Sequence, residues 1–152
     1  YKRQPKYQMV GVFSLQLARL YQYVFELGAH KNYCIVHSLD GYDEVSLTSD
    51  FKRIVKDGEA LCSPYSLGLE KLKQAQLSGG KTVADAALIF RNVLEGKASD
   101  AQRAVVLANA ALAIQCRTDQ APIEDCLEEA TESLDAGKAL QIFKQLIENK
   151  NK

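Results

Sequence analysis

The sequence predicts an α/β domain with a mostly parallel sheet flanked by helices and a helical C-terminal half. Three observations support this class: a strand–helix–strand pattern in the first 38 residues, an apolar run over 32–37, and helical periodicity from residue 82 onward. The chain has 152 residues, of which 47% are hydrophobic and 25% are charged. This length and composition suit one globular domain, and no repeat or linker divides residues 1–152.

The first block of the chain has the pattern of a βαβ unit. Residues 8–13 form a short apolar run, and Ser14 then offers a side-chain cap for a helix. Apolar residues recur at helical spacing from Leu15 to Leu27, where a helix is expected to end. The run over 32–37 is largely apolar at consecutive positions, which is typical of a parallel strand buried on both faces. Such a unit has a right-handed crossover.

The middle of the chain is rich in turns and short alternating segments. Residues 45–48 alternate like a half-exposed strand, and residues 51–56 do the same. Asp57-Gly58 follows as a hairpin-type turn. We therefore expect two further short strands here.

The last part of the chain is predicted to be helical. Capping boxes begin at Thr82 and Ser99, and the helix after Ser99 is apolar nearly all round, which indicates burial. An acidic helix follows Pro122. Gly137 is expected to bend or break it.

The charge balance bears on possible partners. Lys plus Arg and Asp plus Glu both number 19, so the formal net charge is zero. Proteins that bind the phosphate backbone of nucleic acids usually have a basic excess, so we expect no nucleic-acid partner. An acidic stretch spans 124–135, and a few basic residues lie near the start; we interpret both as solvated faces. These basic residues are Lys2, Arg3, Lys6 and Arg19.

Cysteine usage and hydropathy indicate a cytoplasmic protein. The four cysteines form no C-x-x-C pair and match no zinc spacing, so we expect reduced thiols. No apolar stretch is long enough for a membrane span, and no signal peptide opens the sequence. The chain begins with Tyr1 rather than Met, which indicates either a processed start or a piece of something longer.

Three carboxylates follow the strand predicted over 32–37, namely Asp40, Asp43 and Glu44. Ligands of open α/β sheets bind beyond the carboxyl ends of strands, and Mg²⁺ takes one or two carboxylates together with water and phosphate oxygens. The neighbours Asp43 and Glu44 point apart in an extended backbone, so they share one ion only in a turn, or each serves one of two ions. The alternative is an Asp40-Gly41 turn followed by two solvated acids.

Other polar residues have structural interpretations. His37 has no partner His or Cys nearby in sequence and is expected to be a buried structural histidine. Asn109 lies in an apolar helix and needs hydrogen-bond partners, for which backbone groups of a neighbouring element are favoured over a substrate. Gly79-Gly80 precedes a helix but does not have the P-loop spacing, so we interpret it as a turn.

Four segments in order, residues 8–14, 36–46, 79–80 and 105–111, resemble the C-terminal part of anthranilate phosphoribosyltransferase. The resemblance implies a nucleoside phosphorylase/phosphoribosyltransferase-like catalytic domain. It also implies transfer of the phosphoribosyl group of 5-phosphoribosyl 1-diphosphate to anthranilate, with release of pyrophosphate. In this family an adjacent Asp-Glu pair binds Mg²⁺ on the diphosphate, and the pair maps onto Asp43 and Glu44. Homodimers are expected for the complete enzyme.

The chain also departs from the family pattern. The glycine-rich diphosphate loop, the anthranilate-binding arginine and the N-terminal helical domain of the family lie upstream of the match to Gln8, so the resemblance assigns no catalytic or substrate-binding residue here. Ser38 stands where many relatives have Gly. We expect the chain alone to be inactive. Two alternatives stay open: a nucleoside phosphorylase relative and a non-catalytic homologue that binds nucleic acid.

Overall fold

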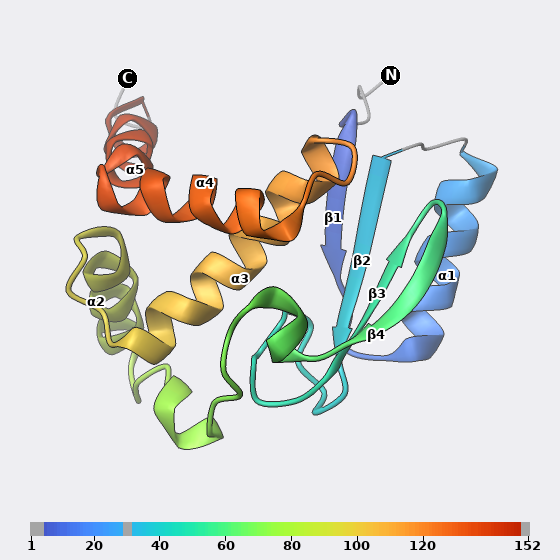
Figure 1. The fold of residues 1–152 in the computed structure, drawn as a ribbon. Helices are drawn as coiled ribbons and strands as arrows, with labels where there is room; N and C mark the ends of the chain where they lie inside the picture. The colour runs from blue at the N-terminus through green and yellow to red at the C-terminus, as the bar shows by residue number, and fades with distance from the viewer. Residues whose placement is uncertain (1–4, 29–31, 150–152) are drawn as a thin grey trace.

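The computed structural model describes residues 5–28 and 32–149, and Figure 1 shows their arrangement. The strands are β1 (Tyr7–Gly11), β2 (Asn32–Ser38), β3 (Phe51–Val55) and β4 (Gly58–Cys62). The α-helices are α1 (Leu15–Leu27), α2 (Val83–Leu94), α3 (Asp100–Arg117), α4 (Ile123–Asp135) and α5 (Lys138–Asn149). Two short 3₁₀ helices lie between β4 and α2, namely η1 (Pro64–Leu67) and η2 (Gln74–Leu77). Of the basic residues near the start, Lys2 and Arg3 lie outside the described residues.

The strands form one mixed sheet in the order β1-β2-β3-β4. β1 and β2 are parallel, with Tyr7 opposite Asn32, as the βαβ pattern predicts. The β2–β3 and β3–β4 pairs are antiparallel, so the expectation of a mostly parallel sheet is wrong. The connections explain the difference. A parallel pair needs a crossover of about a dozen residues or more, usually a helix. Here a tight turn at Lys56 and Asp57 joins β3 to β4, and no helix separates β2 from β3.

Helix α1 covers one face of the sheet. The Ser14 hydroxyl caps it by accepting a hydrogen bond from the Leu17 N–H at 3.2 Å. Its buried Ala18 and Phe25 belong to the same core cluster as Tyr33 of β2. The ring centroids of Phe25 and Tyr33 are 4.9 Å apart. The helix predicted between the first two strands is confirmed.

Helix α3 covers the opposite face. Its Ala108 and Leu112 are buried in one cluster with Cys34 and Val36 of β2. Residues of β2 therefore alternate between two cores, which confirms a strand buried on both faces. Figure 1 shows the sheet between α1 on one side and the group α2–α5 on the other.

The helical half begins and ends its helices where predicted. Thr82 and Ser99 each form a complete capping box, at the start of α2 and α3 respectively. Gly137 adopts a φ of +68° between α4 and α5, a left-handed conformation that favours glycine. The helical conformation is therefore interrupted at this residue, and α4 and α5 are two separate helices.

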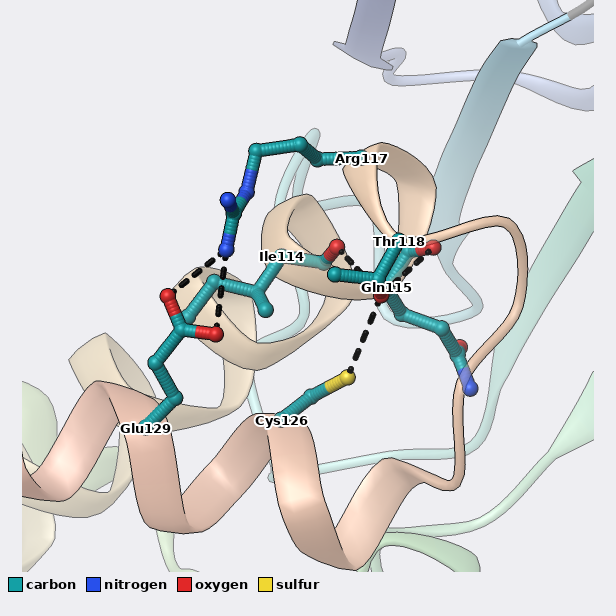
Figure 2. A network of polar contacts seen from close by, with 6 residues as sticks. All are labelled: Ile114, Gln115, Arg117, Thr118, Cys126 and Glu129. Carbon is teal, nitrogen blue, oxygen red and sulfur yellow. Dashed lines mark hydrogen bonds and ion pairs between the residues drawn. The ribbon is translucent and has the colours of Figure 1, made fainter.

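Helix α4 lies against α3, and polar contacts join the two (Figure 2). Arg117 forms an ion pair with Glu129 at 2.7 Å. The Thr118 hydroxyl lies 3.8 Å from the Cys126 sulfur and also donates to the Ile114 carbonyl at 2.9 Å. The acidic side chains of α4 are exposed, as expected for a solvated face.

Residues 45–48 are not a strand, contrary to the prediction. Val45 and Leu47 are fully buried, and Leu47 adopts a left-handed φ of +59°, which a strand cannot contain. The Ser46 N–H donates to the Ser38 hydroxyl at 3.2 Å instead of to a neighbouring strand. The alternating pattern identified Val45 and Leu47 as buried, but Ser46 is only 2% exposed, so the expected half-exposed face is also wrong.

The cysteines are all free, in agreement with the expected reduced thiols. Burial raises the pKa of the Cys34 thiol to about 11, although the nearby Arg53 acts in the opposite direction. This thiol is therefore a core residue and not a nucleophile. Among the described residues, none of the helices has the length and apolar character needed to cross a membrane.

Candidate metal centre

Residues 39–50, called the acidic loop below, leave the carboxyl end of β2 next to the carboxyl end of β1 (Figure 1). Gly11, the last residue of β1, touches this loop. A Cβ atom on Gly11 would lie 1.6 Å from the carbonyl oxygen of Asp43, so no larger residue fits. The loop lies where ligands of open α/β sheets bind, as the sequence predicted.

Asp40 bonds within the acidic loop itself. Its carboxylate accepts hydrogen bonds from the hydroxyls of Ser46, at 3.2 and 3.3 Å, and Thr48. Partial burial pushes the pKa of Asp40 upward, but hydrogen bonds from Thr48, Ser49 and Ser46 outweigh it, so the pKa is lower than usual. Asp40 therefore shapes the loop, and its oxygens already have partners.

Asp43 and Glu44 are exposed, and the structure brings their carboxyl groups together. A side-chain hydrogen bond with Asp43 raises the pKa of Glu44, and partial burial and the negative charge of Asp43 act in the same direction. Two carboxylates in this arrangement repel each other, and a cation between them removes the repulsion. The backbone turns at these residues, so the pair is not split to opposite sides as in a strand.

The main chain beside Glu44 is held by side chains from β2 and α3. The Ser38 hydroxyl donates to the Glu44 carbonyl at 2.7 Å. The Val45 N–H donates to Asn109 Oδ1 at 3.0 Å, and Asn109 Nδ2 donates to the Val45 carbonyl at 2.9 Å. The prediction that Asn109 bonds the backbone of a neighbouring element is confirmed.

Sequence reasoning did not connect Ser38 or Gly11 with the acidic loop. For Gly11 a signal existed, because a glycine in a strand often marks the close approach of another backbone. Nothing in the sequence around Ser38 indicates that its hydroxyl bonds residues six and eight positions further along.

A pocket of about 190 Å³ opens beside Glu44. Polar groups of the acidic loop line one side of it, and apolar side chains of α2 and α3 line the other. The loop residues are Tyr42, Glu44 and Ser46, and the helices contribute Ile89, Val93, Gln102, Val105 and Val106. A larger pocket of about 290 Å³ lies between α1 and the β3–β4 hairpin, but Asp40, Asp43 and Glu44 do not line it. Of the two neighbouring acids, Glu44 therefore lines the smaller pocket, and Asp43 precedes it in the chain.

Gly79-Gly80 lies in the irregular connection between η2 and α2, where Gly80 adopts a left-handed φ of +85°. The carboxylate of Asp85 accepts hydrogen bonds from the N–H groups of Lys81 and Thr82, both at 3.0 Å. These donors at the start of α2 are already paired, so the segment does not form a phosphate cradle.

His37 is a structural residue, as the sequence indicated. Its ring is buried, and Nδ1 lies 2.8 Å from the Val12 carbonyl, which links the end of β2 to the chain leaving β1. Residues 5–28 and 32–149 contain no group of three or more His, Cys, Asp or Glu side chains placed to hold a metal ion.

The donor set of Asp43 and Glu44 fits Mg²⁺ that also binds a substrate. Magnesium sites of this kind use one or two carboxylates, and waters and phosphate oxygens complete the coordination. Two neighbouring carboxylates, of which Glu44 lines a pocket, meet that requirement, whereas a closed all-protein cage would need more ligands.

A family model described as the a/b domain of a glycosyl transferase family matches residues 2–140. The chain therefore belongs to this glycosyl transferase family. Its curated relatives are anthranilate phosphoribosyltransferases, and the chain is homologous to part of that enzyme.

Two relatives illustrate the extent of the match. The anthranilate phosphoribosyltransferase of Bacteroides fragilis (strain YCH46) is 46% identical over 144 residues, which cover 95% of this chain and 43% of that protein. The protein of the same name from Christiangramia forsetii is 48% identical over 142 residues, covering 93% of this chain and 42% of its own length. The chain thus spans less than half the length of these relatives.

Solved structures agree with the fold. Saccharomyces cerevisiae anthranilate phosphoribosyltransferase in complex with 4-fluoroanthranilate superposes with a TM-score of 0.80 at 22% identity, covering 93% of this chain and 42% of that one. The Thermus thermophilus enzyme gives a TM-score of 0.76 at 24% identity, covering 89% and 40%. The yeast enzyme has also been solved in complex with PRPP and Mg, at a TM-score of 0.77 and 24% identity, covering 88% and 39%.

Proposed function

We propose that this chain is part of an anthranilate phosphoribosyltransferase. In the complete enzyme it contributes the Mg²⁺ site for transfer of the phosphoribosyl group of 5-phosphoribosyl 1-diphosphate to anthranilate. The observation that carries the proposal is the Asp43–Glu44 pair, exposed at the carboxyl ends of two parallel strands and beside a pocket. The relatives at 46% and 48% identity support the same reaction. They also favour it over a nucleoside phosphorylase or a nucleic-acid-binding homologue.

The reaction explains why an acid pair is needed. The bond between ribose C1 and a pyrophosphate oxygen breaks, and C1 bonds to the anthranilate nitrogen, which loses a proton. Negative charge accumulates on the departing diphosphate. Mg²⁺, when bound, supplies the positive charge that stabilises this leaving group. Asp43 and Glu44 hold the ion, and the acidic loop sets its place at the pocket.

Apart from the metal site, we assign no part of the active site to this chain. The chain spans 43% of the length of the Bacteroides fragilis relative, and we assign no anthranilate contact to its residues. A homodimer is likewise proposed for the complete enzyme only.

Isothermal titration calorimetry of Mg²⁺ binding in the presence of pyrophosphate tests the metal site. We expect the chain to bind the ion and the double variant Asp43→Asn/Glu44→Gln to lose measurable binding, because neutral amides replace both anionic ligands. The matched control is Glu124→Gln/Asp125→Asn, which neutralises a neighbouring pair of exposed acids on α4.

Each result of this titration has a definite meaning. Binding that is retained in the control and lost in the Asp43→Asn/Glu44→Gln variant supports the site. Equal binding by the wild-type chain and the Asp43→Asn/Glu44→Gln variant would show that the ion is held elsewhere, and the metal assignment would be withdrawn.

A further inference from the structure

We propose that Asn109 of α3 is a positioning residue for the metal centre: it fixes the main chain directly after Glu44 and so sets the direction of that carboxylate. This role rests on the proposed function, because it presumes that Asp43 and Glu44 hold Mg²⁺. Asn109 itself touches neither carboxylate, and its effect passes through the backbone of Val45.

The amide of Asn109 satisfies both backbone groups of a single residue. Oδ1 accepts from the Val45 N–H at 3.0 Å, and Nδ2 donates to the Val45 carbonyl at 2.9 Å. The second hydrogen of Nδ2 goes to the Val105 carbonyl on α3, also at 2.9 Å. The side-chain amide is thus held on its own helix while it holds the loop, and it cannot rotate without breaking hydrogen bonds.

The support behind Asn109 is rigid. The residues around it on the helix, Ala108, Ala111 and Leu112, are 0%, 1% and 1% exposed. Helix α3 contacts β1, β2 and α4, so it is held between the sheet and the outer helices. Val45 is itself 0% exposed, which anchors the loop from the other side.

Glu44 depends on this support because its own side chain is exposed. The backbone on either side of Glu44 therefore contributes to the direction of this side chain. Gly11 abuts the Asp43 carbonyl on one side, and the Ser38 hydroxyl holds the Glu44 carbonyl at 2.7 Å. The following residue, Val45, is hydrogen-bonded by Asn109 of α3, which lies 64 positions further along the chain.

The test measures Mn²⁺ affinity of the chain with pyrophosphate present, by electron paramagnetic resonance. Loss of a group that orients a metal ligand typically weakens affinity about 10–100-fold, and we expect Asn109→Ala to fall in this range. Asn109→Asp keeps the volume and the acceptor for the Val45 N–H but places an oxygen against the Val45 carbonyl, so it weakens binding as well. If Asn109→Ala does not fold, the isosteric Asp variant carries the test.

The matched control is Gln115→Ala, because Gln115 lies on the same helix and its amide also bonds a backbone carbonyl, that of Ala121 at 2.8 Å. We expect this variant to bind Mn²⁺ like the wild type. Hydrogen exchange of the Val45 amide gives a second readout that needs no metal: exchange should accelerate in Asn109→Ala and not in Gln115→Ala.

The outcomes separate the two proposals. A folded Asn109→Ala variant with faster Val45 exchange and wild-type Mn²⁺ affinity overturns the positioning role alone. Equal weakening in Gln115→Ala also overturns it, since general loss of stability would then explain the effect. A wild-type chain that binds no Mn²⁺ overturns the proposed metal site, and the positioning role falls with it.

Discussion

Three carboxylates lie within five residues of the acidic loop, and their surroundings give them different roles. Asp40 accepts hydrogen bonds from hydroxyls of its own loop, so its charge stabilises the local structure of the loop. Asp43 and Glu44 remain exposed, and a side-chain hydrogen bond with Asp43, partial burial and the negative charge of Asp43 raise the pKa of Glu44. Carboxylates in one loop thus have two roles: Asp40 stabilises the loop, whereas Asp43 and Glu44 are the candidate metal ligands.

The lowered pKa of Asp40 makes a pH-dependent prediction. A carboxylate with a depressed pKa stabilises the fold fully above the unfolded aspartate pKa of about 3.9, and the effect is lost as the pH falls through the lower folded value. We therefore expect Asp40→Asn to lower Tm at pH 7. The difference from the wild type should shrink as the pH drops below about 4.

Thermal unfolding followed by circular dichroism at several pH values checks this. Asp125→Asn, which removes an exposed carboxylate from α4, serves as the control and should change Tm less. A Tm difference for Asp40→Asn that persists unchanged at low pH would contradict the stated cause.

At the scale of elements, three segments hold the acidic loop: the end of β1, the end of β2 and the middle of α3. They contact the loop backbone through Gly11, Ser38 and Asn109 respectively. Helix α3 also forms much of the core against β2. The helix that builds the fold therefore also orients the candidate metal ligands.

Gly11→Ala tests the contact between β1 and the acidic loop. The added Cβ would lie 1.6 Å from the Asp43 carbonyl oxygen, so the loop must move. We expect unfolding free energy to fall by at least about 1–3 kcal/mol, the usual cost of overpacking, and Mn²⁺ affinity to weaken. Denaturant unfolding and Mn²⁺ titration measure the two effects.

The control for this variant is Gly79→Ala, because a Cβ there meets no atom within 4 Å. It should leave the unfolding free energy close to that of the wild type. Gly11→Ala with unaltered stability and metal affinity would show that the loop does not need this close contact.

At the scale of the whole molecule, the described residues build a hydrophobic core, although the chain spans less than half the length of its relatives. It spans 43% of the length of the Bacteroides fragilis relative. The chain nevertheless buries three hydrophobic clusters, one on each face of the sheet and one among the helices.

We predict that the chain alone does not form N-(5-phosphoribosyl)anthranilate. The proposed ligands of Mg²⁺ are present, but the glycine-rich diphosphate loop expected for the family is not among the residues of this sequence. Incubation with anthranilate, 5-phosphoribosyl 1-diphosphate and Mg²⁺, with product followed by fluorescence, checks this. Product above the level of the Asp43→Asn/Glu44→Gln variant would refute the prediction.

Much of the local structure could be read from the sequence because it depends on near neighbours. Ser14, Thr82 and Ser99 cap their helices by accepting a hydrogen bond from the residue three positions further along. Gly137 separates α4 from α5 through its own left-handed backbone conformation. The consecutive apolar residues of β2 indicated two buried faces, and the order of acids after it indicated a metal site. Such signals act over one turn of helix or one strand.

Tertiary structure decided the features that join distant segments. Residues 45–48 alternate like a strand, yet their backbone bonds Asn109 and Ser38, and no local pattern predicts a partner 64 positions away. The antiparallel pairing of β3 likewise depends on how the acidic loop folds back. The sequence by itself therefore determined the βαβ start, the capped helices and the presence of the acids. Only the packing of α3 and β1 around the loop decided how the backbone on either side of Glu44 is held, because backbone hydrogen bonds and close contacts are chosen in three dimensions.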